Sequence, residues 1–157
     1  MPFSLSNKVA LVTGSSRGLG RGVAMALGKA GAKVCLNYLN NSEAAEKTLQ
    51  DLRDEGIHAA MFRADASDQS QLNFMVEAIE DKFGSLDILV PNATPDQPQK
   101  PIEDYDADFY RQMYDFFVMS PFMLAQAVLP GMKKRKGGRI INITSEVFHC
   151  SVPEFSA

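Results

Sequence analysis

The chain has 157 residues, 45% of them hydrophobic and 22% charged, and its formal net charge is −3 at pH 7. These values are typical of one globular domain with its own core, and they exclude a second full domain and a strongly basic surface for nucleic acid. We expect neither a signal peptide nor a membrane-spanning stretch, and the expected compartment is the cytoplasm.

The first predicted elements are an apolar strand over residues 9–12 and an amphipathic helix over residues 19–31. Between them, residues 13–20 read Thr-Gly-Ser-Ser-Arg-Gly-Leu-Gly. A glycine-rich turn between a strand and a helix is the setting in which a dinucleotide pyrophosphate binds. The pattern therefore predicts a phosphate-binding turn, and the alternative is a glycine-rich turn that holds no ligand.

Each residue of this turn has an expected part in binding. One glycine permits a tight exit from the strand, and the other two let the backbone approach a phosphate and let the helix pack on the sheet. The unpaired N–H groups of the helix start face the anion, helped by two hydroxyl groups. The predicted cofactor contacts in the turn are Gly14, Ser15, Ser16, Arg17, Gly18, Leu19 and Gly20.

The second strand is predicted over residues 33–38, and its end bears on cofactor choice. Dinucleotide folds that prefer NAD carry an acidic residue there for the ribose 2'-hydroxyl, whereas this chain has Asn37 followed by Tyr38. No carboxylate repels a 2'-phosphate, and Arg17 is available to pair with it, so NADP(H) is favoured over NAD(H). The alternatives are a plain strand-end role for Asn37 and a surface role for Arg17.

Helical and strand patterns then alternate to the end of the sequence. Further helices are predicted over residues 42–55, 70–83 and 106–132, and further strands over 58–63, within 84–90 and within 137–145. Ser42 is the expected N-cap of the first of these helices, Ser67 or Asp68 that of the second, and Pro121 is expected to kink the third. The alternation predicts an α/β fold, a Rossmann-like doubly wound parallel sheet of five strands in the order 3-2-1-4-5.

The sequence resembles the short-chain dehydrogenase/reductase family along all of its 157 residues. The resemblance rests on the turn at residues 13–20, on Pro91-Asn92-Ala93-Thr94 in place of the family's N-N-A-G, and on residues 138–145, which match its G-R-I-V-N-I-S-S. It implies that Asp65, followed by Ala66, contacts the adenine, and that Asn92 and Ala93 line the nicotinamide side. It further implies that Ser145 is catalytic and holds the substrate carbonyl oxygen.

Some residues depart from the family pattern. Pro91 and Thr94 replace an Asn and a Gly. Phe117, or Phe116 if the match shifts by one residue, stands where the family carries a catalytic Asn that holds a water in the proton relay. The family's Tyr-x-x-x-Lys, which supplies the general acid, would begin directly after Ala157. We therefore expect residues 1–157 to be a single NAD(P)-binding Rossmann domain, incomplete at its C-terminus, within a longer or nicked polypeptide.

The remaining reactive side chains give no further pattern. Cys35 and Cys150 form no ligand set, so we expect reduced, unpaired thiols and no metal site. His149 lies in the loop after Ser145, where a lone histidine is more often incidental.

The leading hypothesis is an NADP(H)-dependent oxidoreductase of the short-chain dehydrogenase/reductase type that acts on a ketone or alcohol, with 3-oxoacyl thioesters as one candidate subtype. The alternative is a non-catalytic dinucleotide-binding or scaffold protein of the same fold, and a lyase or dehalogenase is a distant third because all three glycines remain. Expected partners are a small carbonyl or alcohol substrate, the remaining C-terminal polypeptide and further copies in a homodimer or homotetramer, without nucleic acid or membrane.

Overall fold

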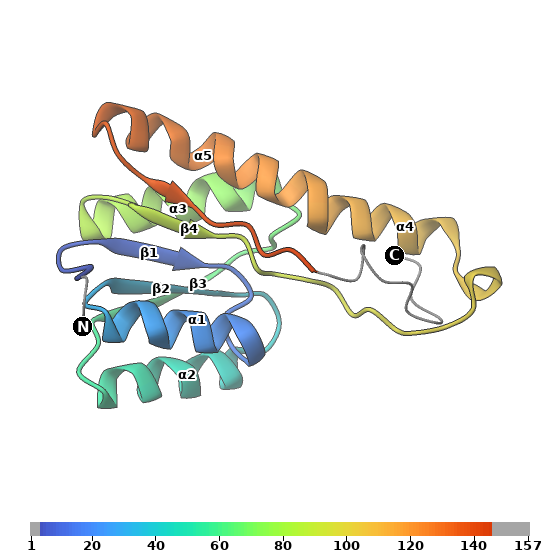
Figure 1. Cartoon of the computed structure of the whole chain (residues 1–157), viewed down its shortest axis with the longest axis horizontal. Coiled ribbons are helices and arrows are strands. Elements are labelled where there is room, and N and C mark those ends of the chain that lie inside the picture. Colours follow the sequence, from blue (N-terminus) through green and yellow to red (C-terminus); the bar gives the residue numbers. More distant parts are fainter. Residues whose placement is uncertain (1–3, 146–157) are drawn as a thin grey trace.

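The structure is a computed structural model that describes residues 4–145. Its centre is a parallel sheet of five strands in the order β3-β2-β1-β4-β5, which confirms the predicted Rossmann-like α/β fold (Figure 1). The strands are β1 Val9–Val12, β2 Lys33–Tyr38, β3 Ala59–Arg63, β4 Ile88–Val90 and β5 Arg139–Ile140. The helices are α1 Gly18–Lys29, α2 Ser42–Asp54, α3 Gln69–Phe83, α4 Ala107–Tyr114 and α5 Ser120–Lys134, with a short 3-10 turn η1 at Ile102–Asp104.

Helices cover both faces of the sheet, α1 and α2 on one face and α3 and α5 on the other (Figure 1). Strand β1 supplies both cores, because Leu11 packs in the cluster with α3 and α5 while Val12 packs in the cluster with α1 and α2. All four residues of β1 are buried. A strand covered on both faces needs apolar residues at every position, which explains the uninterrupted run that marked it in the sequence.

The helix starts follow capping chemistry. Helix α3 begins after Asp68, which was one of the two predicted caps, the other being Ser67. Oδ1 of Asp68 accepts hydrogen bonds from the backbone N–H groups of Gln71 and Ser70. The backbone bond from Gln71 is the main cause that lowers the pKa of Asp68 below its usual value. The expected cap of α2 was wrong by one residue: Asn41, not Ser42, accepts from the N–H of Ala44, at 2.8 Å. Both residue types cap helices well, so composition alone does not separate them.

The helix predicted over residues 106–132, with a kink at Pro121, is divided in two. A π-helical turn, η2 Asp115–Met119, separates α4 from α5, and the N–H of Ser120 bonds to the carbonyl of Asp115, five residues back. Pro121 explains the position, because proline has no N–H and its ring clashes with the carbonyl four residues earlier, that of Phe117. Pro130 also lies inside α5, which the sequence analysis did not anticipate.

Strand β5 is shorter than expected. It pairs with β4 only at Arg139 and Ile140, with a last ladder bond from the N–H of Ile141 to the carbonyl of Leu89 at 2.9 Å. Strand β4 is followed by Pro91, which has no N–H to offer a neighbouring strand, so the pairing stops there. Residues 141–145 are exposed.

By length and composition, the helical segment 107–134 would suffice to cross a membrane, which the sequence analysis did not expect. One face of α5 packs in the core cluster that contains α3, so the apolar residues of that face belong to the domain. The buried residues of this face are Met123, Leu124, Val128 and Met132.

Cys35 lies in the core of β2 and is a free thiol, in agreement with the sequence analysis. Burial raises its pKa to about 12, so the unreactive neutral thiol persists at physiological pH. Cys150 and His149 lie outside the described residues.

Candidate cofactor site

The glycine-rich turn lies at the carboxyl end of β1, between β2 on one side and β4 on the other. The strand order reverses here, since the chain passes outward from β1 through β2 to β3 and then returns to β4. Ligands of open α/β sheets bind at the carboxyl ends of the strands beside such a switch point. The topology therefore places the predicted phosphate turn where a nucleotide is expected.

Glycine is required at the three positions of the turn for different physical reasons. Gly14 has φ +59° and a Cβ on it would lie 2.7 Å from the Cα of Ala93, so the loop after β4 leaves no room for a side chain. Gly20 has no room either, because its Cβ would lie 2.6 Å from the carbonyl oxygen of Gly14 and 2.5 Å from Nδ2 of Asn92. Gly18 has φ +58° with open space around it, as a backbone that receives a ligand requires.

Thr13 and Asn92 tie the turn to the loop after β4. The Thr13 hydroxyl accepts hydrogen bonds from the backbone N–H groups of Asn92, at 2.9 Å, and Ala93, at 3.0 Å. In return, Nδ2 of Asn92 donates to the carbonyls of Thr13, at 2.9 Å, and Gly14, at 3.2 Å. Thr13 is fully buried, and the sequence analysis did not single it out. A hydroxyl residue between a buried strand and a glycine turn is the signal that could have indicated it.

Asn37 ties the same turn to the neighbouring strands. Its Oδ1 accepts from the N–H of Gly14 at 3.2 Å, and its Nδ2 donates to the carbonyl of Ala64, beyond β3, at 3.0 Å. Its own N–H donates to the hydroxyl of Ser15 at 3.1 Å, and that hydroxyl donates to the carbonyl of Val12. Asn37 and Ser15 are both buried, so their side chains hold the turn in place from within the fold. Their predicted contact with the cofactor stays a prediction.

Other predicted contacts are more open. Arg17 is the exposed N-cap residue of α1, and within residues 4–145 its side chain has no carboxylate partner, whereas Arg21 pairs with Asp51 at 2.7 Å. Ser16 and Tyr38 are half-buried, and Leu19 is exposed. The N-terminus of α1 therefore combines the guanidinium of Arg17 with exposed backbone at Gly18. The helix dipole also favours an anion there.

Asp65 lies in the loop between β3 and α3, with buried Ala66 beside it. Its Oδ1 accepts from both the N–H and the hydroxyl of Ser67, at 2.8 and 2.7 Å. Its Oδ2 accepts no hydrogen bond from another residue in the described part of the chain. One carboxylate oxygen is thus fixed in orientation while the other remains able to accept a bond from an amino group.

The predicted catalytic positions lie after β5 and in the π-helical turn. Ser145 follows β5 and is exposed, and the chain leaves β4 and β5 at the same edge of the sheet (Figure 1). Phe117, at the family's Asn position, lies in η2 with 46% of its surface exposed. A phenyl ring has no polar atom with which to hold a water, so the side chain at this position offers no hydrogen bond to a proton relay.

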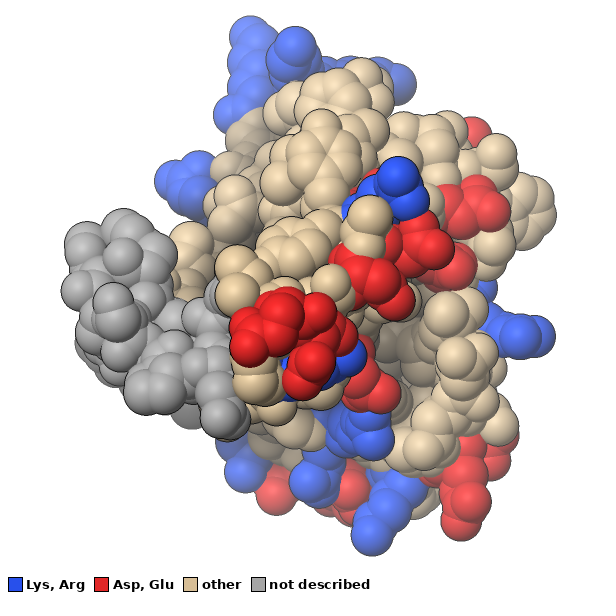
Figure 2. Space-filling model, turned by 90° about the vertical axis from the view of Figure 1, so that its right-hand side faces the viewer, with Lys and Arg blue, Asp and Glu red and all other residues tan. Residues whose placement is uncertain are grey.

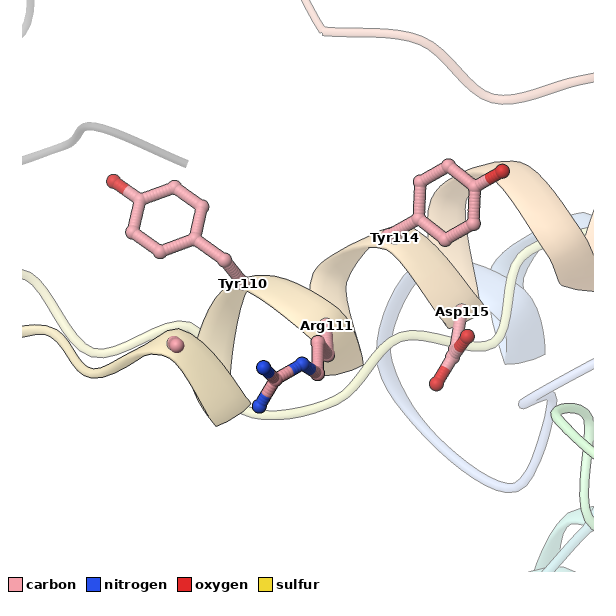
Figure 3. Close-up of a pocket in the computed structure, with 5 residues that line it drawn as sticks. Tyr110, Arg111, Tyr114 and Asp115 are labelled. Atoms are coloured by element: carbon pink, nitrogen blue, oxygen red, sulfur yellow. The ribbon is translucent and has the colours of Figure 1, made fainter.

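A shallow hollow of about 550 Å³ lies elsewhere, along α4 and the start of η2 (Figure 3). The sticks of Figure 3 show that Tyr110 and Tyr114 project from one side of the helix, while Arg111 and Asp115 project from another. Ala107 completes the lining. None of these residues is a predicted cofactor contact, so this hollow is separate from the site at the glycine turn.

The switch-point position, the left-handed glycines and the exposed helix start define a Rossmann-like nucleotide-binding protein. Residues 8–157 match the sequence profile of the short-chain dehydrogenases, and the chain belongs to that family.

Known relatives agree with this assignment. The chain is 38% identical to the uncharacterized oxidoreductase YxjF of Bacillus subtilis over 90% of its own length and 54% of the relative. It is 33% identical to the 3-oxoacyl-(acyl-carrier-protein) reductase FabG of Staphylococcus epidermidis, over 90% of this chain and 57% of that one. The chain thus spans little more than half the length of these curated relatives.

Solved structures are similar as well. One is a gluconate 5-dehydrogenase from Burkholderia cenocepacia in complex with NADP and tartrate, with a TM-score of 0.88 and 33% identity. The match covers 98% of this chain and 60% of that one.

The contacts of Gly20 lead to a first prediction. Gly20→Ala places a Cβ against backbone and against Asn92, and we expect it to lower the free energy of unfolding by about 1–3 kcal/mol and to weaken nucleotide binding. Gly22→Ala is the matched control, because Gly22 lies in the same helix with nothing within 4 Å of a Cβ. It should raise stability by about 0.5–1 kcal/mol. Urea unfolding measures both, and equal effects of the two variants would contradict the assigned packing.

Proposed function

We propose that this chain holds the cofactor site of an NADP(H)-dependent oxidoreductase that transfers hydride between the nicotinamide and a carbonyl or alcohol carbon. The observation that carries the proposal is the phosphate turn, with Gly18 open to solvent and Gly14 and Gly20 packed without room for a side chain. When bound, the cofactor supplies the hydride chemistry. The oxidoreductase names of the relatives and the NADP complex of a structural neighbour support the same class.

The residues present fit such a cofactor. The first N–H groups of α1 and the open backbone at Gly18 would hold the pyrophosphate. Oδ2 of Asp65, whose partner oxygen is already fixed by Ser67, would accept a hydrogen bond from the adenine amino group. Asn92 and Ala93, fixed by Thr13, would line the nicotinamide side.

The preference for NADP(H) rests on the charges around the end of β2. Residues 37–42 read Asn-Tyr-Leu-Asn-Asn-Ser and contain no carboxylate. Arg17 is exposed at the start of α1 and has no ion-pair partner within the described residues. A guanidinium without a carboxylate neighbour is well suited to a 2'-phosphate, so we assign Arg17 to that group.

The catalytic role falls to Ser145, whose hydroxyl would hold the substrate carbonyl oxygen as hydride arrives. The family resemblance implies a Tyr-x-x-x-Lys for proton transfer, which we propose lies later in the polypeptide than Ser145. With Phe117 at the Asn position, the proton relay runs through another group. The substrate class is a small ketone or alcohol, for which the named activities of relatives give 3-oxoacyl thioesters and sugar acids as first choices to assay.

The second candidate is a cofactor-binding protein without turnover. The replacement of the relay Asn by Phe117 favours it, because the ring is open to solvent and offers no proton path. This candidate and the enzyme share the same cofactor site, so only turnover separates them.

The surface of the α4–α5 segment supports self-association, which we propose as a homodimer or homotetramer. Exposed apolar side chains follow one another along this segment, and Figure 2 shows uncharged side chains over much of this end of the molecule, beside acidic ones. They are Tyr110, Tyr114, Phe117, Val118, Phe122 and Leu129. Contiguous apolar surface of this kind marks a protein interface. We further propose a cytoplasmic location for the assembled protein.

The role of Arg17 gives a second prediction. Arg17→Gln removes the proposed charge-assisted bonds to the 2'-phosphate and should raise the Kd for NADPH about 10- to 100-fold, since such bonds contribute about 1.5–3 kcal/mol. The Kd for NADH should stay unchanged. Arg53→Gln, at the far end of α2, is the control. Fluorescence titration with both nucleotides measures the two Kd values. An equal loss of affinity for NADPH and NADH would show that Arg17 does not bind the 2'-phosphate.

A third prediction concerns turnover by the complete polypeptide as its gene encodes it. NADPH oxidation should occur with a member of a panel of ketones, 3-oxoacyl thioesters and keto sugar acids. Ser145→Ala should lower kcat about 10²- to 10³-fold with the Kd for NADPH unchanged, because the hydroxyl acts on the substrate oxygen. Cofactor binding without turnover on any substrate of the panel would favour the non-catalytic candidate.

A fourth prediction concerns the assembly. Phe122→Lys puts a charge into the apolar surface of α5 and should shift the protein toward monomer in analytical ultracentrifugation. Phe74→Lys is the control, because Phe74 on α3 is 76% exposed and lies outside the α4–α5 segment. Unchanged sedimentation of the Phe122 variant would show that the α4–α5 surface is not the interface.

A further inference from the structure

Thr48, in α2, makes a side-chain hydrogen bond to the phosphate turn that the site described so far does not include. It lies in the middle of α2, is 2% exposed, and its Oγ1 donates to the carbonyl of Ser16, in the phosphate turn, at 2.8 Å. Threonine inside a helix more often bonds to the carbonyl one turn earlier in its own helix. Here the hydroxyl reaches instead to a segment 32 residues earlier in the sequence.

The exposed part of the turn has little else to hold it. Within the described residues, Thr48 provides the one side-chain hydrogen bond to residues 16–19. Arg17 makes no capping bond with its side chain, Gly18 has no side chain, and Leu19 is 62% exposed. Gly14, which precedes this segment, is held by the side chains of Asn37 and Asn92. Where the turn becomes more exposed, Thr48 takes over as its side-chain anchor.

The bond fixes the orientation of one peptide unit. The carbonyl of Ser16 and the N–H of Arg17 belong to the same planar trans peptide and point in opposite directions. With the carbonyl turned toward α2, the N–H of Arg17 points away from α2. Together with the φ of Arg17, −156°, this plane sets the direction in which the Cα–Cβ bond of Arg17 leaves the backbone.

A second link between α2 and the start of α1 leaves Arg17 available. Arg21 pairs with Asp51, one helical turn after Thr48, and this pair is partly exposed. Asp51 is thereby engaged by Arg21 and not by Arg17. Helix α2 therefore contributes a buried anchor for the backbone before Arg17 and, separately, an ion-pair partner for Arg21.

We propose that Thr48 is a positioning residue for the cofactor, which anchors the Ser16–Arg17 peptide so that the Arg17 side chain meets the 2'-phosphate. The inference rests on the proposed preference for NADP(H). Helix α2 supplies no predicted cofactor contact of its own. The proposed anchor at Thr48 gives this helix a part in nucleotide selection.

The test compares Thr48→Val with Thr48→Ser in the complete polypeptide. The Val variant keeps the shape and loses the hydroxyl, and its Kd for NADPH should rise about three- to tenfold, the usual effect of one lost hydrogen bond, while the Kd for NADH rises less. The Ser variant should keep the wild-type ratio of the two constants. Asp51→Asn is the matched control, because it loosens the contact between α1 and α2 without touching Ser16.

Amide hydrogen exchange of the cofactor-free protein provides a readout independent of nucleotide. Exchange of residues 17–19 should be faster in Thr48→Val than in the wild type and in Asp51→Asn. Unchanged exchange and an unchanged Kd ratio in the Val variant would overturn the proposal, as would an equal loss of NADPH and NADH affinity in both the Val and Asp51 variants.

The two proposals fail in different ways. A wild-type protein that binds NADH as tightly as NADPH overturns the proposed cofactor preference. The exchange rates then decide by themselves whether Thr48 anchors the turn, and equal rates in wild type and Thr48→Val reject that anchoring.

Discussion

The reciprocal hydrogen bonds between Thr13 and Asn92 are the interaction on which the site depends. A side chain of the turn binds the backbone of the β4 loop, and a side chain of the β4 loop binds the backbone of the turn. Such bonds need the two backbones close together, which in turn demands glycine at positions 14 and 20. Because Thr13 is buried, leaving its bonds unmade would cost the full desolvation penalty, so turn and loop keep one relative position.

The sheet order and the turn could be predicted from the sequence. Uninterrupted apolar runs are typical of buried strands, and glycines are typical of left-handed backbone. The inward direction of Asn37 and Ser15 could not, since their residue types suit a ligand contact and an internal bond equally well. The length of β5 depended on Pro91 in its neighbour, and the π-helical turn on the carbonyl before Pro121. Such features arise from pairs of residues in three dimensions, which periodicity along one chain does not record.

The glycine turn and the α4–α5 segment differ in how their polar and apolar side chains are exposed. Around the turn, polar side chains are buried and paired, and in the described residues no buried polar side-chain atom lacks a hydrogen-bond partner. Along α4 and α5, large apolar side chains are exposed, including Phe117 at 46%. The position that the family resemblance aligns with a polar residue thus carries an exposed apolar ring in this chain. The ring of Phe117 therefore bears on two proposals at once, because it offers no polar atom to a water and adds to the apolar surface proposed for association.

The hydrogen bonds of Asn37 limit which residue types the fold accepts at the end of β2. Nδ2 of Asn37 donates to the carbonyls of Ala64 and Phe62, at 3.0 and 3.4 Å. A carboxylate at this position would offer only acceptors to those carbonyls and would bury a charge, a change that costs several kcal/mol in folded proteins. An acidic residue selecting NAD therefore has no place at position 37 of this chain. Under the proposed preference for NADP(H), the choice of nucleotide would rest with more exposed residues, namely the loop after Tyr38 and Arg17, for which we propose Thr48 as the positioning residue.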